Sequence, residues 1–123
     1  MDPQARILVV EDEALVAFAL EEMLGDFGYD VVGPAPSIKA AMKLVAGERV
    51  DAAILDVNLG RESIDPVAGA LAKAGVPFVF TTGYTNTSAL PNGFKDRPVL
   101  NKPYQPEALR DAIQQLLGAG HLS

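Results

Sequence analysis

The sequence predicts an α/β fold, a doubly wound five-stranded parallel sheet with helices on both faces. Five apolar runs are too short for helices and are rich in Val and Ile, which is typical of strands buried on both faces. Segments with helical spacing separate the runs, and this alternation favours parallel strands joined by right-handed crossovers. The runs are Arg6–Val10, Val31–Val32, Ala52–Leu55, Phe78–Phe80 and Val99–Leu100.

Four helices are expected, because apolar residues recur every three or four positions between and after these strands. Ser37 is the predicted N-cap of the second helix, and Asp65-Pro66 the predicted N-cap and first residue of the third. The last helix is expected from about Pro106 to Leu117. The predicted helix stops are Gly28, Gly47 and Gly75. The predicted inward-facing residues are, helix by helix, Val16, Leu20, Met23 and Phe27; Ile38, Ala41, Met42 and Val45; Val67, Ala70, Leu71 and Ala74; and Leu109, Ile113 and Leu116.

Two segments depart from this alternation. Thr85–Arg97 is polar and is interrupted by Pro91 and Asn92-Gly93, so we expect a loop or at most one helical turn there. The Gly-rich tail Gly118–Ser123 is expected to be frayed.

Composition limits the possible functions. A chain of 123 residues with 49% apolar content fits one domain, so we expect a single domain over residues 1–123 without a second folded domain. The net charge of −6, without any Lys/Arg cluster, argues against nucleic-acid binding. The sequence has no cysteine, no signal peptide and no long apolar run, so we expect a cytoplasmic protein without a membrane span.

The most informative residues follow the strands. Glu11-Asp12 follows the first strand, Asp56 follows the third, Thr82 ends the fourth and Lys102-Pro103 follows the fifth. The carboxyl ends of parallel strands share one edge of the sheet, so these side chains should converge on the crevice where open α/β folds bind ligands. Taken singly, the acidic residues could be helix-dipole partners or turn residues. Their joint occurrence at successive strand ends favours a site.

The chemistry of this set points to a cation and a phosphoryl group. Mg²⁺ prefers oxygen ligands, which Glu11, Asp12 and Asp56 can supply. A carboxylate can act as a nucleophile toward phosphorus when cationic groups neutralise the phosphoryl oxygens. Lys102 is suited to that task, and Thr82 can donate a hydroxyl hydrogen bond.

With these residues in this order, the chain resembles the receiver domain of bacterial two-component response regulators. The resemblance implies the flavodoxin-like strand order 2-1-3-4-5, phosphorylation of Asp56, and catalytic help from Thr82 and Lys102. It also implies a Mg²⁺ site in which Asp12 and Asp56 bind directly, Asn58 binds through its backbone carbonyl and Glu11 acts through water. The implied partner is a sensor histidine kinase or a histidine phosphotransfer protein. The protein itself would be a monomer or weak dimer and not an enzyme that turns over a substrate.

The run Phe80-Thr81-Thr82-Gly83-Tyr84 is similar to the FAT GUY subgroup of receivers, which are commonly stand-alone and several of which act in general stress signalling. Two features depart from the family pattern. Most receivers carry a Tyr or Phe switch residue three positions before the lysine, and this chain has Val99 there. The family's fourth helix, which lies between the fourth and fifth strands, is expected to be short or absent within Thr85–Arg97. Whether Tyr84 replaces the missing aromatic residue stays open.

Three classes of function remain. The leading one is a phosphoacceptor that serves as a relay member, a phosphate sink or a protein-interaction switch. The second is a pseudo-receiver that binds partners without phosphorylation. The third is a Mg²⁺-dependent phosphohydrolase, for which an Asp-x-Asp pattern would be expected after the first strand where this chain has Glu11-Asp12.

Overall fold

The computed structural model describes residues 4–59, 62–83, 97–102 and 105–121. All five strands form one parallel sheet in the order β2-β1-β3-β4-β5, which confirms the predicted fold class and strand order. The elements are β1 Arg6–Val10, α1 Ala14–Asp26, β2 Asp30–Ala35, α2 Ile38–Gly47, β3 Ala52–Asp56, α3 Asp65–Ala74, β4 Phe78–Thr82, β5 Val99–Asn101 and α4 Pro106–His121.

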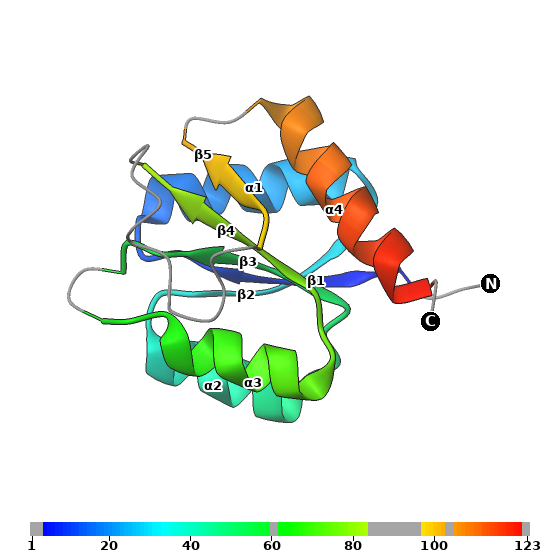
Figure 1. The fold of residues 1–123 in the computed structure, drawn as a ribbon. Coiled ribbons are helices and arrows are strands. Elements are labelled where there is room, and N and C mark those ends of the chain that lie inside the picture. The colour runs from blue at the N-terminus through cyan, green and yellow to red at the C-terminus, as the bar shows by residue number, and fades with distance from the viewer. Residues whose placement is uncertain (1–3, 60–61, 84–96, 103–104, 122–123) are drawn as a thin grey trace.

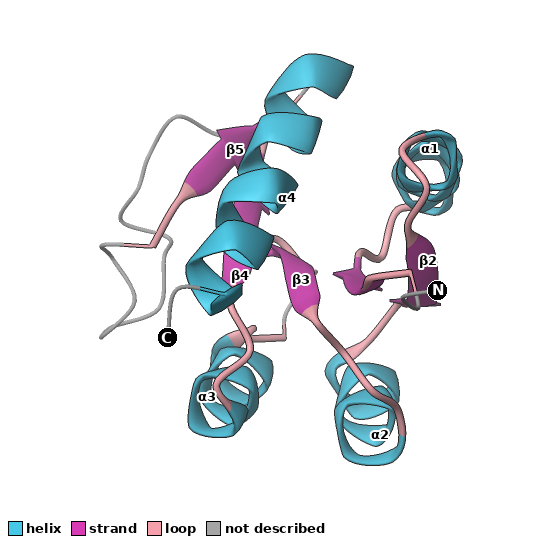
Figure 2. Cartoon of the chain, turned by 90° about the vertical axis from the view of Figure 1, so that its right-hand side faces the viewer, coloured by secondary structure: helices cyan, strands magenta, loops and turns pink. Residues whose placement is uncertain are grey.

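The helices cover both faces of the sheet. Helices α2 and α3 lie on one face and α1 and α4 on the other, as Figures 1 and 2 show. Alternate side chains along each strand point to opposite faces, so neighbouring residues enter different cores. In β1, Leu8 and Val10 belong to the core beneath α2 and α3, whereas Ile7 and Val9 belong to the core beneath α1 and α4. Each fully buried Leu, Ile or Phe side chain contributes about 1.5–3 kcal/mol, so these two cores are the main source of stability.

Strand β2 is longer than predicted. The apolar run predicted only Val31–Val32, but the strand includes Gly33-Pro34 and continues to Ala35. As the edge strand of the described sheet, β2 can include a proline, since the missing N–H is not needed on an edge. Gly33 has φ +98°, and a Cβ there would lie 2.7 Å from the Ala35 backbone nitrogen.

The irregularity in β2 helps to position the candidate site. The pairing of β1 with β2 shifts register between Leu8 and Val10, so Val10 lies opposite Ala35. The Ala35 carbonyl then accepts a hydrogen bond from the backbone N–H of Glu11 at 3.0 Å. The backbone of the first candidate residue is therefore fixed by the edge strand as well as by β1.

Two predicted helix starts can be compared with the structure. Ser37 caps α2 as predicted, with its side chain accepting a hydrogen bond from Ala40 N at 3.2 Å. Helix α3 begins at Asp65 itself, one residue earlier than predicted, so Asp65 is not the N-cap. Ser63 Oγ accepts a hydrogen bond from Asp65 N at 3.1 Å. Ser63, and not Asp65, therefore provides a side-chain acceptor for a backbone N–H at the start of this helix.

The predicted inward faces are correct for most positions and wrong for two. Met42 and Ala74 are exposed, because Ala41 and Leu44 face the core in α2 and Ala74 is the last residue of α3. In α1, Ala17 and Leu24 are buried although they were not predicted. The prediction of a frayed tail was wrong for residues 118–121, because α4 continues to His121, and residues 122–123 lie outside the described residues. Each glycine inside a helix costs about 1 kcal/mol of helix stability relative to alanine. This cost makes the end of α4 less favourable as a helix but does not terminate it at Gly118.

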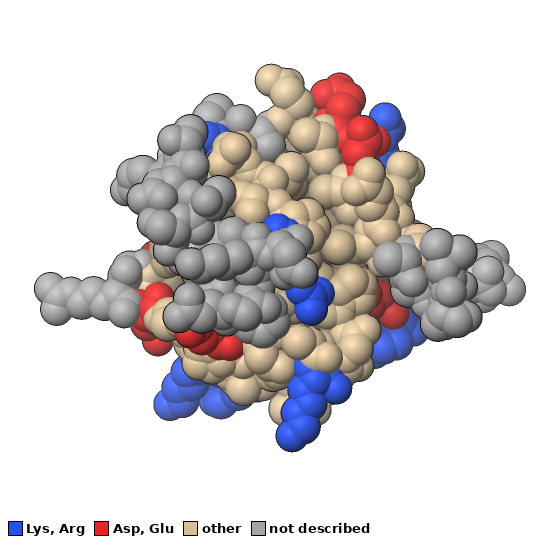
Figure 3. All heavy atoms as spheres, in the orientation of Figure 1, with Lys and Arg blue, Asp and Glu red and all other residues tan. Residues whose placement is uncertain are grey.

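The predicted loop at Thr85–Arg97, with its short or absent fourth helix, lies outside the described residues except for Arg97. The same holds for Tyr84. On the face drawn in Figure 3, Lys and Arg side chains are spread over the surface and do not gather in one patch.

Candidate functional site

Parallel pairing brings the ends of β1, β3, β4 and β5 to one edge of the sheet. Val10 lies opposite Leu55, so Glu11 and Asp56 follow side by side. Thr82 lies opposite Asn101, and the Thr82 carbonyl accepts a hydrogen bond from the backbone N–H of Lys102 at 2.8 Å. Residues that are far apart in the sequence therefore meet at this edge because of strand register alone.

The structure brings the three predicted acidic residues together. Carboxylate oxygens of Glu11, Asp12 and Asp56 all lie within 4.8 Å of one another. Glu11 and Asp56 are buried, whereas Asp12 is exposed. Glu11 Oε2 accepts a hydrogen bond from the backbone N–H of Glu13 at 3.1 Å, which holds its carboxylate at the start of α1. The cluster thus has two fixed buried carboxylates and one at the solvent boundary.

Lys102 supplies the positive charge of the site. Its Nζ lies 2.8 Å from Glu11 Oε1 and 3.4 Å from Asp56 Oδ1, and its side chain is only 15% exposed. Burial lowers the pKa of Lys102, but the hydrogen bond to Glu11 and the charges of Asp56 and Glu11 outweigh it and raise the pKa overall. Lys102 is therefore a permanent cation shared by two carboxylates.

The environment of Asp56 disfavours its negative charge. Burial is the largest cause and, together with the charge of Glu11, it raises the pKa of Asp56 to about 7. The Asn58 N–H and Lys102 act in the opposite direction and are outweighed. Asp56 Oδ2 is buried and accepts no hydrogen bond from any described residue. A cation or an electrophile at this oxygen would offset the cost of an unpartnered buried carboxylate.

Asn58 makes two contacts that were not predicted from the sequence. Its backbone N–H donates to Asp56 Oδ1 at 3.0 Å, and its side-chain Oδ1 accepts a hydrogen bond from Thr82 Oγ1 at 3.1 Å. The first contact is the two-residue pattern by which an aspartate fixes the turn after it, so the Asp-x-Asn spacing was an available signal. The second contact joins the loop after β3 to the last residue of β4, which is distant in sequence, and no sequence pattern indicates it.

The donor set fits a hard divalent cation. All the candidate ligand atoms are oxygens, one buried oxygen of Asp56 has no hydrogen-bond partner among the described residues, and Asp12 is open to solvent. Mg²⁺ binds one or two carboxylates and keeps several waters, which an edge site of this kind permits.

Comparison with known proteins gives the family. Residues 7–114 match the family model described as the response regulator receiver domain. The chain belongs to this family. It is 31% identical to the phyllosphere-induced regulator PhyR of Methylorubrum extorquens over 121 residues, which are 94% of this chain and 45% of PhyR. This receiver chain spans about half the length of the curated relatives it matches.

Two solved structures are close to this receiver. The solution structure of SdrG from Sphingomonas melonis Fr1 has 42% sequence identity and a TM-score of 0.82, covering 95% of this chain and 99% of that one. The BeF3-activated conformation of SdrG from Pseudomonas melonis Fr1 has 41% identity and a TM-score of 0.78, with the same coverage of 95% and 99%.

The surface of α1 beside the site was also missed by sequence reasoning. Leu15 and Phe18 are 86% and 59% exposed, although both are large and apolar. They lie on the helix that flanks a hollow of about 530 Å³, and Lys102 and Gly83 line the same hollow. The signal was present, because the predicted inward stripe of this helix left Leu15 and Phe18 on its outer side. Among the described residues of this receiver, no helix is long and apolar enough to cross a bilayer.

Proposed function

We propose that this receiver accepts a phosphoryl group on Asp56, with Mg²⁺, from a histidine kinase or a histidine phosphotransfer protein. The observation that supports this most strongly is the buried Asp56 carboxylate, which has one oxygen without a hydrogen-bond partner among the described residues and lies beside Lys102. Glu11 is also buried, but its Oε2 accepts the Glu13 N–H and its Oε1 lies 2.8 Å from Lys102 Nζ, whereas Asp56 Oδ2 has no such partner among the described residues.

The proposed transfer is a displacement at phosphorus. A carboxylate oxygen of Asp56 forms a new P–O bond while the P–N bond of the donor phosphohistidine breaks, and the bonding pair leaves on the imidazole nitrogen. Lys102 neutralises negative charge on the phosphoryl oxygens, and Thr82 donates a hydrogen bond to one of them. Asn58 N–H holds the other side of the Asp56 carboxylate in position.

The Mg²⁺ site would be formed by Asp12, Asp56 and the backbone carbonyl of Asn58, with Glu11 acting through water. Bound there, Mg²⁺ would supply charge neutralisation for the transferring phosphoryl oxygens. Glu11 is held by a hydrogen bond from the Glu13 N–H and by its ion pair with Lys102. It would therefore help to position the Lys102 ammonium and would add a negative charge to the cation site.

The donor protein would dock on the outer face of α1. Leu15 and Phe18 present apolar surface there, and the adjacent hollow is continuous with the site because Lys102 lines it. A partner seated in this hollow would lie beside Lys102, whose Nζ is 3.4 Å from Asp56 Oδ1. Phe18→Ser should lower transfer from a histidine kinase much more than it lowers labelling by acetyl phosphate, which needs no docked protein.

After phosphorylation the protein would act as a relay member, a phosphate sink or a protein-interaction switch rather than as an enzyme with turnover. The resemblance of the Phe80–Tyr84 motif to the FAT GUY subgroup supports a place in general stress signalling. The expectations of a single domain without an effector, of a cytoplasmic location, and of a monomer or weak dimer stay predictions.

Incubation with acetyl phosphate and Mg²⁺ tests the assignment. Intact-mass measurement should show one added phosphoryl group that hydroxylamine removes, and Asp56→Asn should show none. Asp51→Asn is the matched control, because Asp51 lies at the opposite edge of the sheet and should leave labelling intact. A labelled Asp56→Asn protein would contradict the assignment. Absence of labelling in the wild type, from acetyl phosphate and from kinases alike, would favour the phosphorylation-independent pseudo-receiver.

A further inference from the structure

Asn58 connects the two residues on either side of the proposed phosphoryl position. Its backbone N–H contacts Asp56 Oδ1 at 3.0 Å, and its side-chain Oδ1 accepts the Thr82 hydroxyl at 3.1 Å. Thr82 is 2% exposed and is the last residue of β4, so its hydroxyl lies in a confined place. The β3–α3 loop is thereby joined to β4 through a neutral side-chain hydrogen bond, in addition to the backbone hydrogen bond from Val57 N–H to the Thr81 carbonyl.

The Thr82 hydroxyl has a single proton and can donate it to only one acceptor at a time. In this structure the acceptor is the amide oxygen of Asn58. A phosphoryl group on Asp56 would bring charged oxygens to the same neighbourhood, and hydrogen bonds to charged acceptors are roughly twice as strong as neutral ones. The amide oxygen and the phosphoryl oxygen therefore compete for the same proton.

We propose that Asn58 is a positioning residue whose side-chain amide holds the Thr82 hydroxyl in the resting protein. Phosphorylation then moves this hydrogen bond from Asn58 Oδ1 to a phosphoryl oxygen, and the strength of the resting bond sets how readily the active arrangement forms. This inference rests on the proposed function. It gives Asn58 a side-chain role in addition to the proposed ligand role of its backbone carbonyl.

Removing the amide should make activation easier. Asn58→Ala deletes the competing acceptor but keeps the backbone N–H and carbonyl of residue 58. A neutral hydrogen bond contributes about 0.5–1.5 kcal/mol, which corresponds to a change of about 2- to 12-fold in an equilibrium constant. We therefore expect Asn58→Ala to bind beryllofluoride, a phosphoryl mimic, about 2- to 12-fold more tightly at saturating Mg²⁺.

A double-mutant cycle separates this role from a general structural effect. Thr82→Val keeps the shape of the side chain but removes the proton, so adding Asn58→Ala to it should no longer tighten beryllofluoride binding. In the metal-free protein, NMR couplings of Thr82 should show one χ1 rotamer in the wild type and rotamer averaging in Asn58→Ala. Asn58→Asp retains an acceptor oxygen and should restore the single rotamer.

The outcomes are distinguishable. Equal beryllofluoride affinity of wild type and Asn58→Ala, or the same gain in the Thr82→Val background, would overturn the role of Asn58 and leave the proposed function standing. An unchanged Thr82 rotamer in metal-free Asn58→Ala would also overturn it. Failure of the wild type to bind beryllofluoride with Mg²⁺ would instead overturn the proposed function, and the role of Asn58 with it.

Discussion

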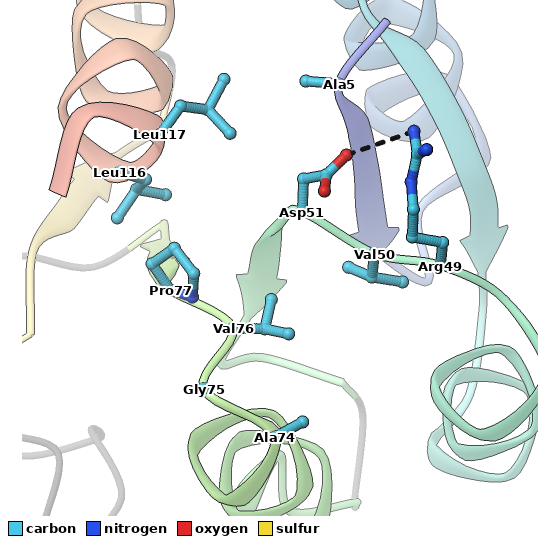
Figure 4. Close-up of a pocket in the computed structure, with 10 residues that line it drawn as sticks. All are labelled: Ala5, Arg49, Val50, Asp51, Ala74, Gly75, Val76, Pro77, Leu116 and Leu117. Atoms are coloured by element: carbon cyan, nitrogen blue, oxygen red, sulfur yellow. Dashed lines mark ion pairs between the residues drawn. The ribbon is translucent and has the colours of Figure 1, made fainter. Parts of the chain in front are cut away.

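Both edges of the sheet carry charged residues, but the two edges differ in how deeply these residues are buried and how completely they are paired. At the amino edge, Asp51 Oδ2 accepts a hydrogen bond from Arg6 N at 2.8 Å and lies 3.5 Å from Arg49 Nη2. Figure 4 shows this pair beside a hollow of about 460 Å³, which is otherwise lined mainly by small and apolar residues. The side chains of Arg49 and Asp51 are 49% and 35% exposed, so water and protein together satisfy them.

At the carboxyl edge the charges are buried and incompletely paired. The side chains of Glu11 and Asp56 are each 1% exposed, and they share the single ammonium of Lys102. Asp56 Oδ2 has no hydrogen-bond partner among the residues that the structure describes. A hollow and an ion pair are present at both edges, so neither feature identifies a site. The unpartnered buried oxygen is what distinguishes the carboxyl edge.

Removing the cation at each edge should give the largest difference. Lys102→Met keeps much of the side-chain volume but leaves two buried carboxylates without a positive partner, so the metal-free protein should lose about 3–5 kcal/mol of unfolding free energy. Arg49→Met removes one member of an exposed pair and should cost about 0–1 kcal/mol. Urea denaturation in the presence of a chelator measures both values. Equal losses would show that burial does not separate the two edges.

Mg²⁺ should stabilise the protein through the carboxyl edge alone. A ligand present at about 100 times its dissociation constant raises the unfolding free energy by about 2.7 kcal/mol when only the folded state binds it. Asp12→Ala should lose this response, and without metal it should be no less stable than wild type because one repelling carboxylate is gone. Asp51→Asn should keep the response. If Mg²⁺ stabilises Asp12→Ala and wild type equally, the cation binds elsewhere.

The sequence was sufficient for the fold and for the membership of the acidic cluster. Strand alternation and the positions of Glu11, Asp56 and Lys102 follow from apolar runs and from what comes directly after them, whereas the strand order was predicted from the resemblance to the receiver family. These features are local or are fixed by parallel register. The resemblance to the receiver family rested on the polar residues that follow the strands.

Features that depend on contacts between distant segments could not be predicted. The extension of β2 through Gly33-Pro34 is possible because β2 is an edge strand, and edge position is a property of the whole sheet. The hydrogen bond between Thr82 and Asn58 joins residues 24 positions apart. The exposure of Met42 depends on which residues of α2 meet the core, and apolar spacing alone wrongly placed Met42 on the inward face and left out Leu44.

The smallest expected difference between the edges concerns the protonation of Asp56. Its pKa is raised to about 7 by burial and by the charge of Glu11, so the folded protein holds this proton more tightly than the unfolded chain does. For such a group, stability is lost as the pH rises from about 4 through about 7. Asp56→Asn removes the buried charge and should stabilise the metal-free protein by about 1–3 kcal/mol at about pH 8.

The gain from Asp56→Asn should shrink at about pH 5, because much of the wild-type Asp56 is then protonated in the folded state and the carboxyl is neutral. Unfolding free energies of both proteins at the two pH values, with a chelator present, measure this. Asp51→Asn at the amino edge should not raise the unfolding free energy at either pH, because it replaces a carboxylate that already accepts a hydrogen bond from Arg6 N. A gain that is the same at both pH values would mean that the introduced amide stabilises by packing or hydrogen bonding and that the charge of Asp56 is not the cause.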